Sequence, residues 1–223
     1  MYKSYNIKFN LGRQDLIRGL FNYETHSWSE VAIDSFIRAA VNVQKPLKLD
    51  FYSSGWFAEA NCKFLYKSNV IDIPIILRIS TDESRRSKWV IAAVKRPAPE
   101  KAVAASAAII AKDPGKFINP ASHSSNFIAL EKALNDKENL PAYFDDPFFK
   151  RTYSTDFYYA VLNGMIKLLY VKDVKYHFLQ VGGYVFAVEH FQRDALNSGW
   201  LINSMKKVSV ADQEDYKKRL LEE

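Results

Sequence analysis

The sequence predicts an α+β protein made of two tandem modules, each a helix packed on a curved antiparallel sheet. Three observations lead to this prediction. Of the 223 residues, 48% are hydrophobic, which is enough to form a large core. Amphipathic helical patterns occur beside strands of period two. The same order of elements, a helix followed by a hairpin and a further strand, occurs twice along the chain.

The first module is expected over residues 1–96. The alternating polar and apolar residues 1–9 predict a strand. Ser27 and Glu30 have the spacing of a capping box, so a helix is expected to start there. The residues 47–52 that follow this helix predict a short strand.

A hairpin is expected over residues 56–81, followed by a third strand from Lys88. If Ser68-Asn69 is the turn, Cys62 lies opposite Ile75, and every residue on that side of the hairpin is apolar or aromatic. A slip of one residue would exchange the two sides, so the pattern constrains the register. Cys62 is therefore predicted to be a buried core residue and not a nucleophile.

The second module is expected over residues 97–223, after a proline-rich boundary at Arg96–Glu100. It begins with a helical insert over 100–138, and an aromatic loop at 140–149 is expected to pack against the protein and to carry an exposed acidic turn, Asp145-Asp146. Its remaining elements are a helix over 154–172, strands over 174–181, 184–193 and 200–208, and a terminal helix over 212–221.

Two segments 111 residues apart are alike in sequence. Residues 87–95, SKWVIAAVK, and residues 198–206, SGWLINSMK, align without gaps and share Ser, Trp, Ile and Lys. Trp89 and Trp200 are thus expected to occupy equivalent places in the cores of the two modules. A period of this length indicates a duplicated domain and not a solenoid, whose units are shorter.

This last strand follows a helix and a hairpin and has a small-Trp-x-Ile-x-x-apolar pattern. It resembles the last strand of the nuclear transport factor two-like superfamily, over roughly residues 28–96 and 126–208. The resemblance implies a cystatin-like α+β roll, in which a curved sheet wraps around a helix to form a cone. Members include isomerases, dehydratases and non-catalytic binding or assembly domains, so the resemblance implies fold more than function.

The formal charge of +6 is carried by the first module. Residues 1–96 have 15 Lys and Arg against 9 Asp and Glu, whereas the remaining residues have 16 of each sign. Such an excess is typical either of a solvated surface, which we favour, or of a protein that binds nucleic acid or an anionic surface. The candidate anion-binding residues are Arg78, Arg85, Arg86 and Lys88.

Two histidines near the second hairpin are candidate catalytic residues. With the Gly-Gly pair as the turn, His177 and His190 would lie on one face as diagonal neighbours, and Tyr176 and Glu189 would pair on the other. Imidazole is suited to general acid or base catalysis near neutral pH. The alternative, which we favour, is that these residues only interrupt a half-exposed sheet.

No metal or cofactor site is predicted. One cysteine and four scattered histidines do not make a zinc site, and two histidines alone lack a third ligand. The sequence has no phosphate-binding glycine loop, Gly-x-Ser-x-Gly elbow or metalloprotease motif. No apolar run approaches the roughly 20 residues of a membrane span. A cytoplasmic location is expected if Met1 is the native start, and export if a leader was removed.

These patterns favour a non-catalytic binding or assembly protein that recognises a protein or a small apolar ligand, and that could form a homo-oligomer. Two other functions stay open. One is an isomerase-like or dehydratase-like enzyme that uses His177, His190, Glu189 or Tyr176, and the other is the binding of nucleic acid or an anionic surface. A deep closed pocket that holds at least two of His177, His190 and Glu189 would favour the enzyme.

Overall fold

The computed structural model describes residues 12–24, 27–42, 44, 48–82, 85–95, 110–192, 194 and 197–222. The strand expected over residues 1–9, the boundary expected at residues 96–100 and residues 100–109 of the expected helical insert lie outside the described residues. No helix in the described part of the chain is both long and apolar enough to cross a membrane.

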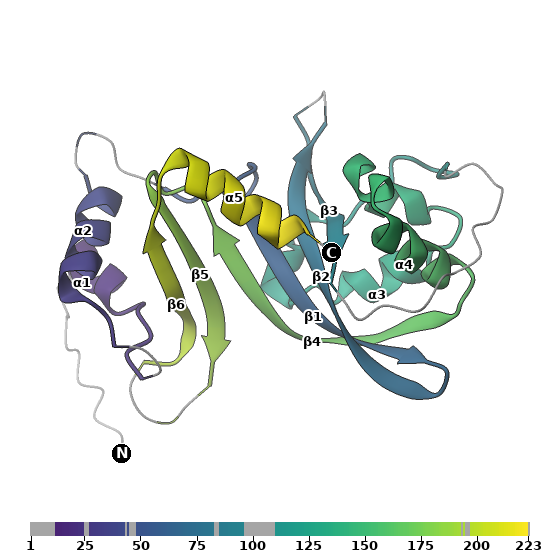
Figure 1. Ribbon diagram of the computed structural model, residues 1–223, viewed down its shortest axis with the longest axis horizontal. Helices are drawn as coiled ribbons and strands as arrows, with labels where there is room; N and C mark the ends of the chain where they lie inside the picture. Colours follow the sequence, from purple (N-terminus) through teal and green to yellow (C-terminus); the bar gives the residue numbers. More distant parts are fainter. Residues whose placement is uncertain are drawn as a thin grey trace, which may run out of the picture.

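Six strands form one antiparallel sheet in the order β3-β2-β1-β4-β5-β6, so the protein has the predicted α+β class (Figure 1). Each half of the chain contributes a meander of three consecutive strands to this sheet. The strands are β1 (Trp56–Tyr66), β2 (Asn69–Thr81), β3 (Ser87–Val94), β4 (Ile166–Phe178), β5 (Tyr184–Phe191) and β6 (Gly199–Lys207).

The sequence led us to expect a separate sheet in each half of the chain, but the two halves share one sheet. β1 pairs with β4 along its whole length, from Trp56 opposite Phe178 to Tyr66 opposite Ile166, and one hydrophobic core includes residues of both halves. The two tryptophans of the sequence repeat also differ. Trp89 is fully buried, whereas Trp200 is 36% exposed.

The helices α1 (Arg13–Arg18) and α2 (Glu30–Ala40) lie beside β6 and cover one end of the sheet (Figure 1). The N-cap of α2 is Ser29, whose hydroxyl accepts a hydrogen bond from the backbone N–H of Ala32, so the helix begins slightly later than expected. The ring of Phe36 on α2 packs edge-on against Tyr184 and Phe186 of β5. These contacts hold α2 against the sheet.

The other end of the core is covered by the middle of the chain. The aromatic loop packs inward, because Phe144 and Phe148 are buried. The elements here are the 3-10 turns η1 (Pro120–Ser125), η2 (Leu140–Tyr143) and η3 (Asp146–Lys150) and the helices α3 (Ala129–Asn135) and α4 (Thr152–Leu162).

The prediction of a helix over 154–172 is correct in its first half and wrong in its second half. α4 ends at Leu162, Gly164 has a φ of +70°, and the chain then enters β4 at Ile166. A positive φ is easily adopted by glycine and stops a right-handed helix. Beyond it, Ile166 and Leu168 are buried and the residue between them is exposed, so burial follows the period of a strand.

The β1–β2 hairpin has its turn at Lys67-Ser68, one residue before the expected position. Both residues have positive φ, 45° and 66°, as a type I′ turn requires. Cys62 therefore pairs with Ile73 and not with Ile75. A shift of two in the register leaves each side chain on its predicted face, and Cys62 is fully buried as expected.

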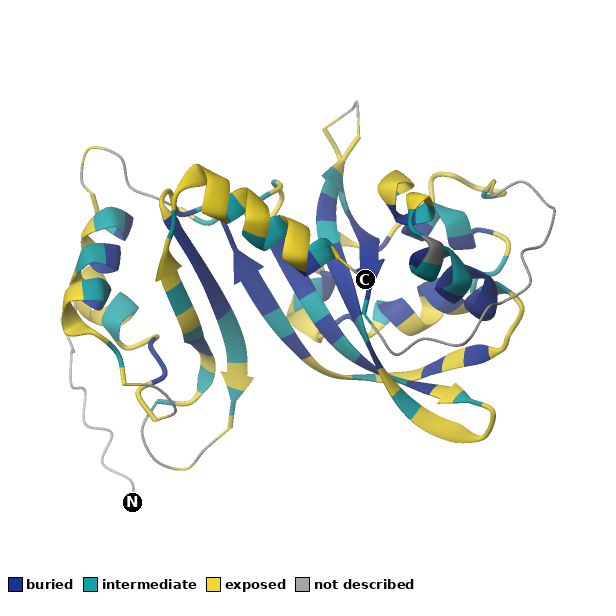
Figure 2. Ribbon diagram, in the orientation of Figure 1, coloured by how far each residue is buried: buried dark blue, intermediate teal, exposed yellow. Residues whose placement is uncertain are grey.

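The terminal helix α5 (Val210–Leu221) crosses the opposite face of the sheet. A capping box of Ser209 and Asp212 starts this helix. Its buried Leu220 joins a second, smaller core that contains Phe57 and Val185. The sheet is therefore buried on both faces along much of its centre, as the dark strands of Figure 2 show.

Candidate functional site

A cavity of about 590 Å³ lies between the sheet and the helices at its β6 end. Its walls come from α1, α2, β4, β5, β6, η1 and the residues around Phe51. The segment 48–51 was expected to belong to a strand but is irregular, and it contributes to the wall in this form. A volume of this size is typical of small-molecule sites. We call this cavity the apolar pocket.

Most side chains that line the apolar pocket are aromatic or aliphatic. The aliphatic ones come from α1, α2, the irregular segment and the strands. The aromatic ones are Phe36, Phe51, Tyr176, Phe178, Phe186 and Trp200. Removing apolar surface of this kind from water is favourable, so the wall is chemically suited to contact with hydrocarbon or aromatic groups.

Strand alternation directs these side chains into the pocket. Tyr176 and Phe178 are two residues apart on β4, as Phe186 and Val188 are on β5, so each pair shares one face of the sheet. Ile202 extends the wall onto β6. Opposite the sheet, α2 contributes side chains spaced four residues apart, which lie on one face of a helix.

His123 is a polar group in the pocket wall. Its Nδ1 lies 2.7 Å from the carbonyl oxygen of Pro120, which can only accept, so Nδ1 carries the hydrogen of this contact. The ring stacks on Phe51, with centroids 5.4 Å apart. The hydroxyl of Tyr176 donates to the backbone oxygen of His123 at 2.7 Å. Burial raises the pKa of Tyr176, so this hydroxyl keeps its proton.

Trp56 packs against the pocket wall without lining the pocket. Its indole contacts the rings of Phe51, His123 and Phe178 and is 1% exposed. Its Nε1–H is buried and has no hydrogen-bond partner in the described part of the chain. Such an orphaned donor is rare, because a buried polar group without a partner costs free energy.

The mouth of the pocket combines exposed hydrophobic side chains with positive charge. Leu20 is 46% exposed, Phe51 40% and Trp200 36%. Trp200 therefore belongs to the pocket rim and is not the core anchor that the sequence led us to expect. Arg13 and Lys48 also line the pocket and are exposed, which places their charges at the entrance.

The four candidate catalytic residues do not come together. The β4–β5 register pairs Tyr176 with Val188 and His177 with Ala187, one residue away from the expected register. His177 therefore lies on the face of α5, with Glu189, which forms an ion pair with Lys175. Tyr176 lies on the pocket face, where the exposed His190 packs edge-on against Trp200.

His177 belongs instead to a hydrogen-bonded cluster between the sheet and α5. Its Nε2 lies 3.0 Å from Oε2 of Glu59, and its Nδ1 lies 2.7 Å from the hydroxyl of Tyr216. The hydrogen bond from His177 lowers the pKa of Glu59, and burial raises the pKa of Tyr216 to about 12. Because Tyr216 is far from ionising, it is not an activated nucleophile.

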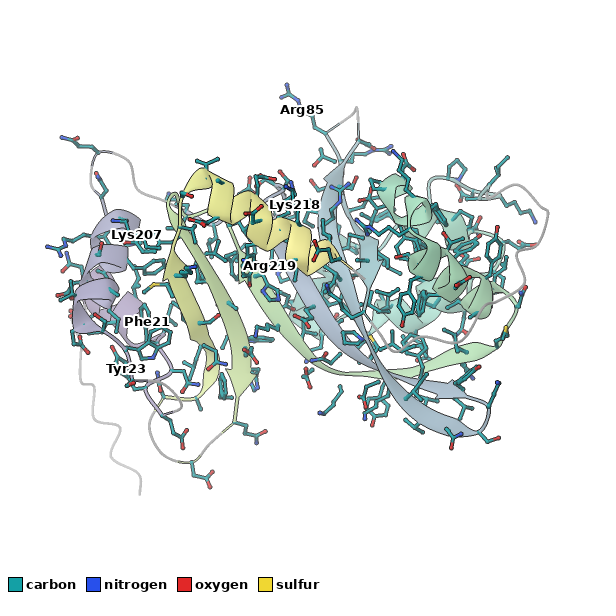
Figure 3. The ribbon with its side chains drawn as sticks, in the orientation of Figure 1. Phe21, Tyr23, Arg85, Lys207, Lys218 and Arg219 are labelled. Atoms are coloured by element: carbon teal, nitrogen blue, oxygen red, sulfur yellow. The ribbon has the colours of Figure 1, made fainter. Side chains whose placement is uncertain are left out.

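The candidate anion-binding residues are largely paired within the protein. Arg78 makes a bidentate ion pair with Asp145, at 2.6 and 2.8 Å, and Arg86 pairs with Asp82 at 2.8 Å. The side chain of Asp145 is only 12% exposed, so the prediction that the acidic turn is exposed was wrong for this residue. Lys88 donates to a backbone carbonyl. Arg85 extends away from the molecule at the β2–β3 turn (Figure 3).

Sequence reasoning did not identify His123, Phe51, Arg13 or Lys48 as site residues. No local motif marks them, because they meet only when distant segments pack together. Within the described ranges, no group of three or more His, Cys, Asp or Glu side chains is placed to hold a metal ion.

No family model matches the chain, no curated protein matches it, and no solved structure matches it. The class that fold and site define is an α+β protein with one antiparallel sheet and an apolar pocket on one face of it.

Proposed function

We propose that the protein is a non-catalytic binding protein that holds a small apolar ligand in the apolar pocket. The supporting observation is the cavity of about 590 Å³ with its aromatic wall and its exposed hydrophobic rim. We favour a small ligand over a protein partner because the apolar surface is concave, whereas most protein interfaces need a larger and flatter area.

Burial of the hydrophobic rim would contribute favourable free energy to ligand binding. Leu20, Phe51 and Trp200 expose hydrophobic surface to water around one opening. A ligand that covers this surface and fills the cavity gains about 25 cal/mol for each Å² of apolar area removed from water. Contiguous exposed apolar surface of this kind is characteristic of ligand and partner sites.

An isomerase-like or dehydratase-like activity is the less favoured alternative. Of the four candidate catalytic residues, only Tyr176 lines the pocket, and its hydroxyl is bonded to a backbone carbonyl. The pocket therefore lacks the pair of candidate groups that would favour catalysis. The resemblance to the nuclear transport factor two-like superfamily, whose cone can hold a ligand, remains a prediction that is compatible with binding.

The proposal can be tested with Nile red, a neutral dye whose fluorescence increases and shifts to the blue in apolar surroundings. We expect saturable binding to the wild-type protein. Val188 lines the pocket and is half-buried, so the larger side chain in Val188→Trp should narrow the cavity and weaken binding about tenfold. Val70→Trp is the matched control, because Val70 is 57% exposed near the β1–β2 turn.

A second filling variant protects the test against misfolding. Leu49→Trp changes a pocket residue in the irregular segment, outside the sheet. Dye affinities are compared only for variants whose circular dichroism spectrum and unfolding midpoint are close to those of the wild type. Equal dye affinity in a folded Val188→Trp or Leu49→Trp protein would exclude the apolar pocket as the binding site.

A further inference from the structure

We infer that the ligand is an amphipathic anion, with its apolar body against the aromatic wall and its anionic headgroup near Arg13 and Lys48 at the mouth. This inference rests on the proposed function and adds the chemical class of the ligand. It is carried by the charge and position of the polar groups around the pocket.

Apart from Tyr176, whose buried hydroxyl keeps its proton, the titratable groups among the described lining residues of the pocket are basic. Arg13, Lys48 and His123 line it, and no Asp or Glu is among its described lining residues. The two exposed cations stand beside hydrophobic rim residues, where part of the surrounding water is replaced by hydrocarbon. An anionic headgroup at this place is attracted by both charges, whereas a cationic one is repelled by both.

The aromatic wall alone does not determine whether the headgroup is anionic or cationic. Aromatic faces such as those of Phe51 and Trp200 attract cations, and cages of such rings recognise quaternary ammonium ligands. Here that attraction is opposed by the full positive charges of Arg13 and Lys48 at the same opening. A full charge acts more strongly and over a longer distance than a ring quadrupole, so the balance favours an anion.

The interior of the pocket fixes the direction in which the ligand enters. The hydroxyl of Tyr176 is already bonded to the backbone oxygen of His123, and Nδ1 of His123 is bonded to Pro120. The side chains of Phe178 and Phe186 on the sheet wall are hydrocarbon. A charged group buried there would lose its hydration without gaining a cationic partner. The apolar body therefore enters first, and the headgroup stays at the mouth.

Three probes that share one hydrocarbon chain test the inference: dodecanoate, dodecanol and dodecylammonium. Each is titrated against the Nile red complex of the full chain, below its micelle concentration. We expect dodecanoate to compete about fivefold more strongly than dodecanol, because two exposed charges each contribute modestly. Dodecylammonium should compete least. Added salt should reduce the advantage of dodecanoate and leave dodecanol unchanged.

Charge reversal gives the sharper result. In the double variant Arg13→Glu/Lys48→Glu, the preference should change from dodecanoate to dodecylammonium, with little change for dodecanol. The control Lys67→Glu/Arg85→Glu makes the same change of net charge at two exposed positions in the turns after β1 and β2. It should keep the preference for dodecanoate, which separates a local effect from that of net charge.

The outcomes separate this inference from the proposed function. If dodecanol or dodecylammonium competes as well as dodecanoate in the wild type, the pocket binds apolar ligands and the anionic headgroup is wrong. The same conclusion follows if the preference for dodecanoate survives charge reversal at Arg13 and Lys48. If neither Nile red nor any of the three probes binds, the proposed function itself fails.

Discussion

The hydroxyl of Tyr216 on α5 lies 2.7 Å from Nδ1 of His177 on β4. Because the other ring nitrogen of His177 faces the carboxylate of Glu59, which can only accept, Nε2 carries a hydrogen. Nδ1 makes the second hydrogen bond of the ring, with the hydroxyl of Tyr216. This chain of contacts satisfies a histidine that is 4% exposed, and it attaches the terminal helix to the sheet.

Removal of the Tyr216 hydroxyl should destabilise the protein. Tyr216→Phe leaves Nδ1 of the buried His177 without its partner, so we expect the free energy of unfolding to fall by about 1–2 kcal/mol. Denaturant unfolding followed by circular dichroism measures this change. Tyr52→Phe is the control, because the side chain of Tyr52 is largely exposed. Equal stability of the two variants would show that the contact contributes nothing.

Glu59 should make stability depend on pH in the acid range. Its pKa in the folded protein lies below the usual 4.5, so the folded state favours the carboxylate more than the unfolded state does. This contribution is fully present above pH 4.5 and is lost as the pH falls through the folded pKa. Glu59→Gln should therefore lose less stability than the wild type between about pH 6 and pH 3. Parallel curves for the two proteins would contradict this.

The ion pair of Arg78 and Asp145 should stabilise the attachment of the aromatic loop to β2. Asp145→Asn leaves a partly buried guanidinium without its carboxylate, so we expect a loss of about 2 kcal/mol. Asp146→Asn is the matched control, since Asp146 is the exposed neighbour. A double-mutant cycle with Arg78→Gln measures the coupling, and additive effects would contradict a direct contribution of the pair.

The thiol of Cys62 should be unreactive in the native protein. Cys62 is fully buried, and burial raises its pKa, so access and thiolate formation are both suppressed. A bulky aromatic disulfide reagent should modify it at the rate of unfolding in native buffer and rapidly in denaturant. Rapid modification without denaturant would mean that the β1–β2 face opens more readily than its packing suggests.

The two hairpins explain why part of the site could be predicted and part could not. In the β1–β2 hairpin the predicted register was wrong by two residues, which preserved the faces, so the burial of Cys62 was predicted correctly. In the β4–β5 hairpin the predicted register was wrong by one residue. This error exchanged the two faces of one strand relative to the other, so His177 and His190 lie on opposite faces of the sheet. Glycines allow several turn geometries, and tertiary contacts choose between them.

The helix assigned over 154–172 failed for a related reason. Ile166 and Leu168 fit either a helical or a strand pattern over so short a distance. In the folded protein this segment pairs with β1 from Tyr66 to Trp56, with two register shifts, and Gly164 ends α4 before it. The strand is therefore selected by a partner about a hundred residues away in the sequence, which a local pattern does not contain.

The sequence by itself determined the α+β class, the buried face of the first hairpin and the positions of most strands and of the terminal helix. These features depend on residues a few positions apart, whose periodicity and capping chemistry are local. Only the tertiary structure decided that both halves share one sheet and that α1, α2 and the segment at Phe51 enclose a pocket. Those features depend on pairing and packing between distant segments, whose relative positions follow from the whole chain.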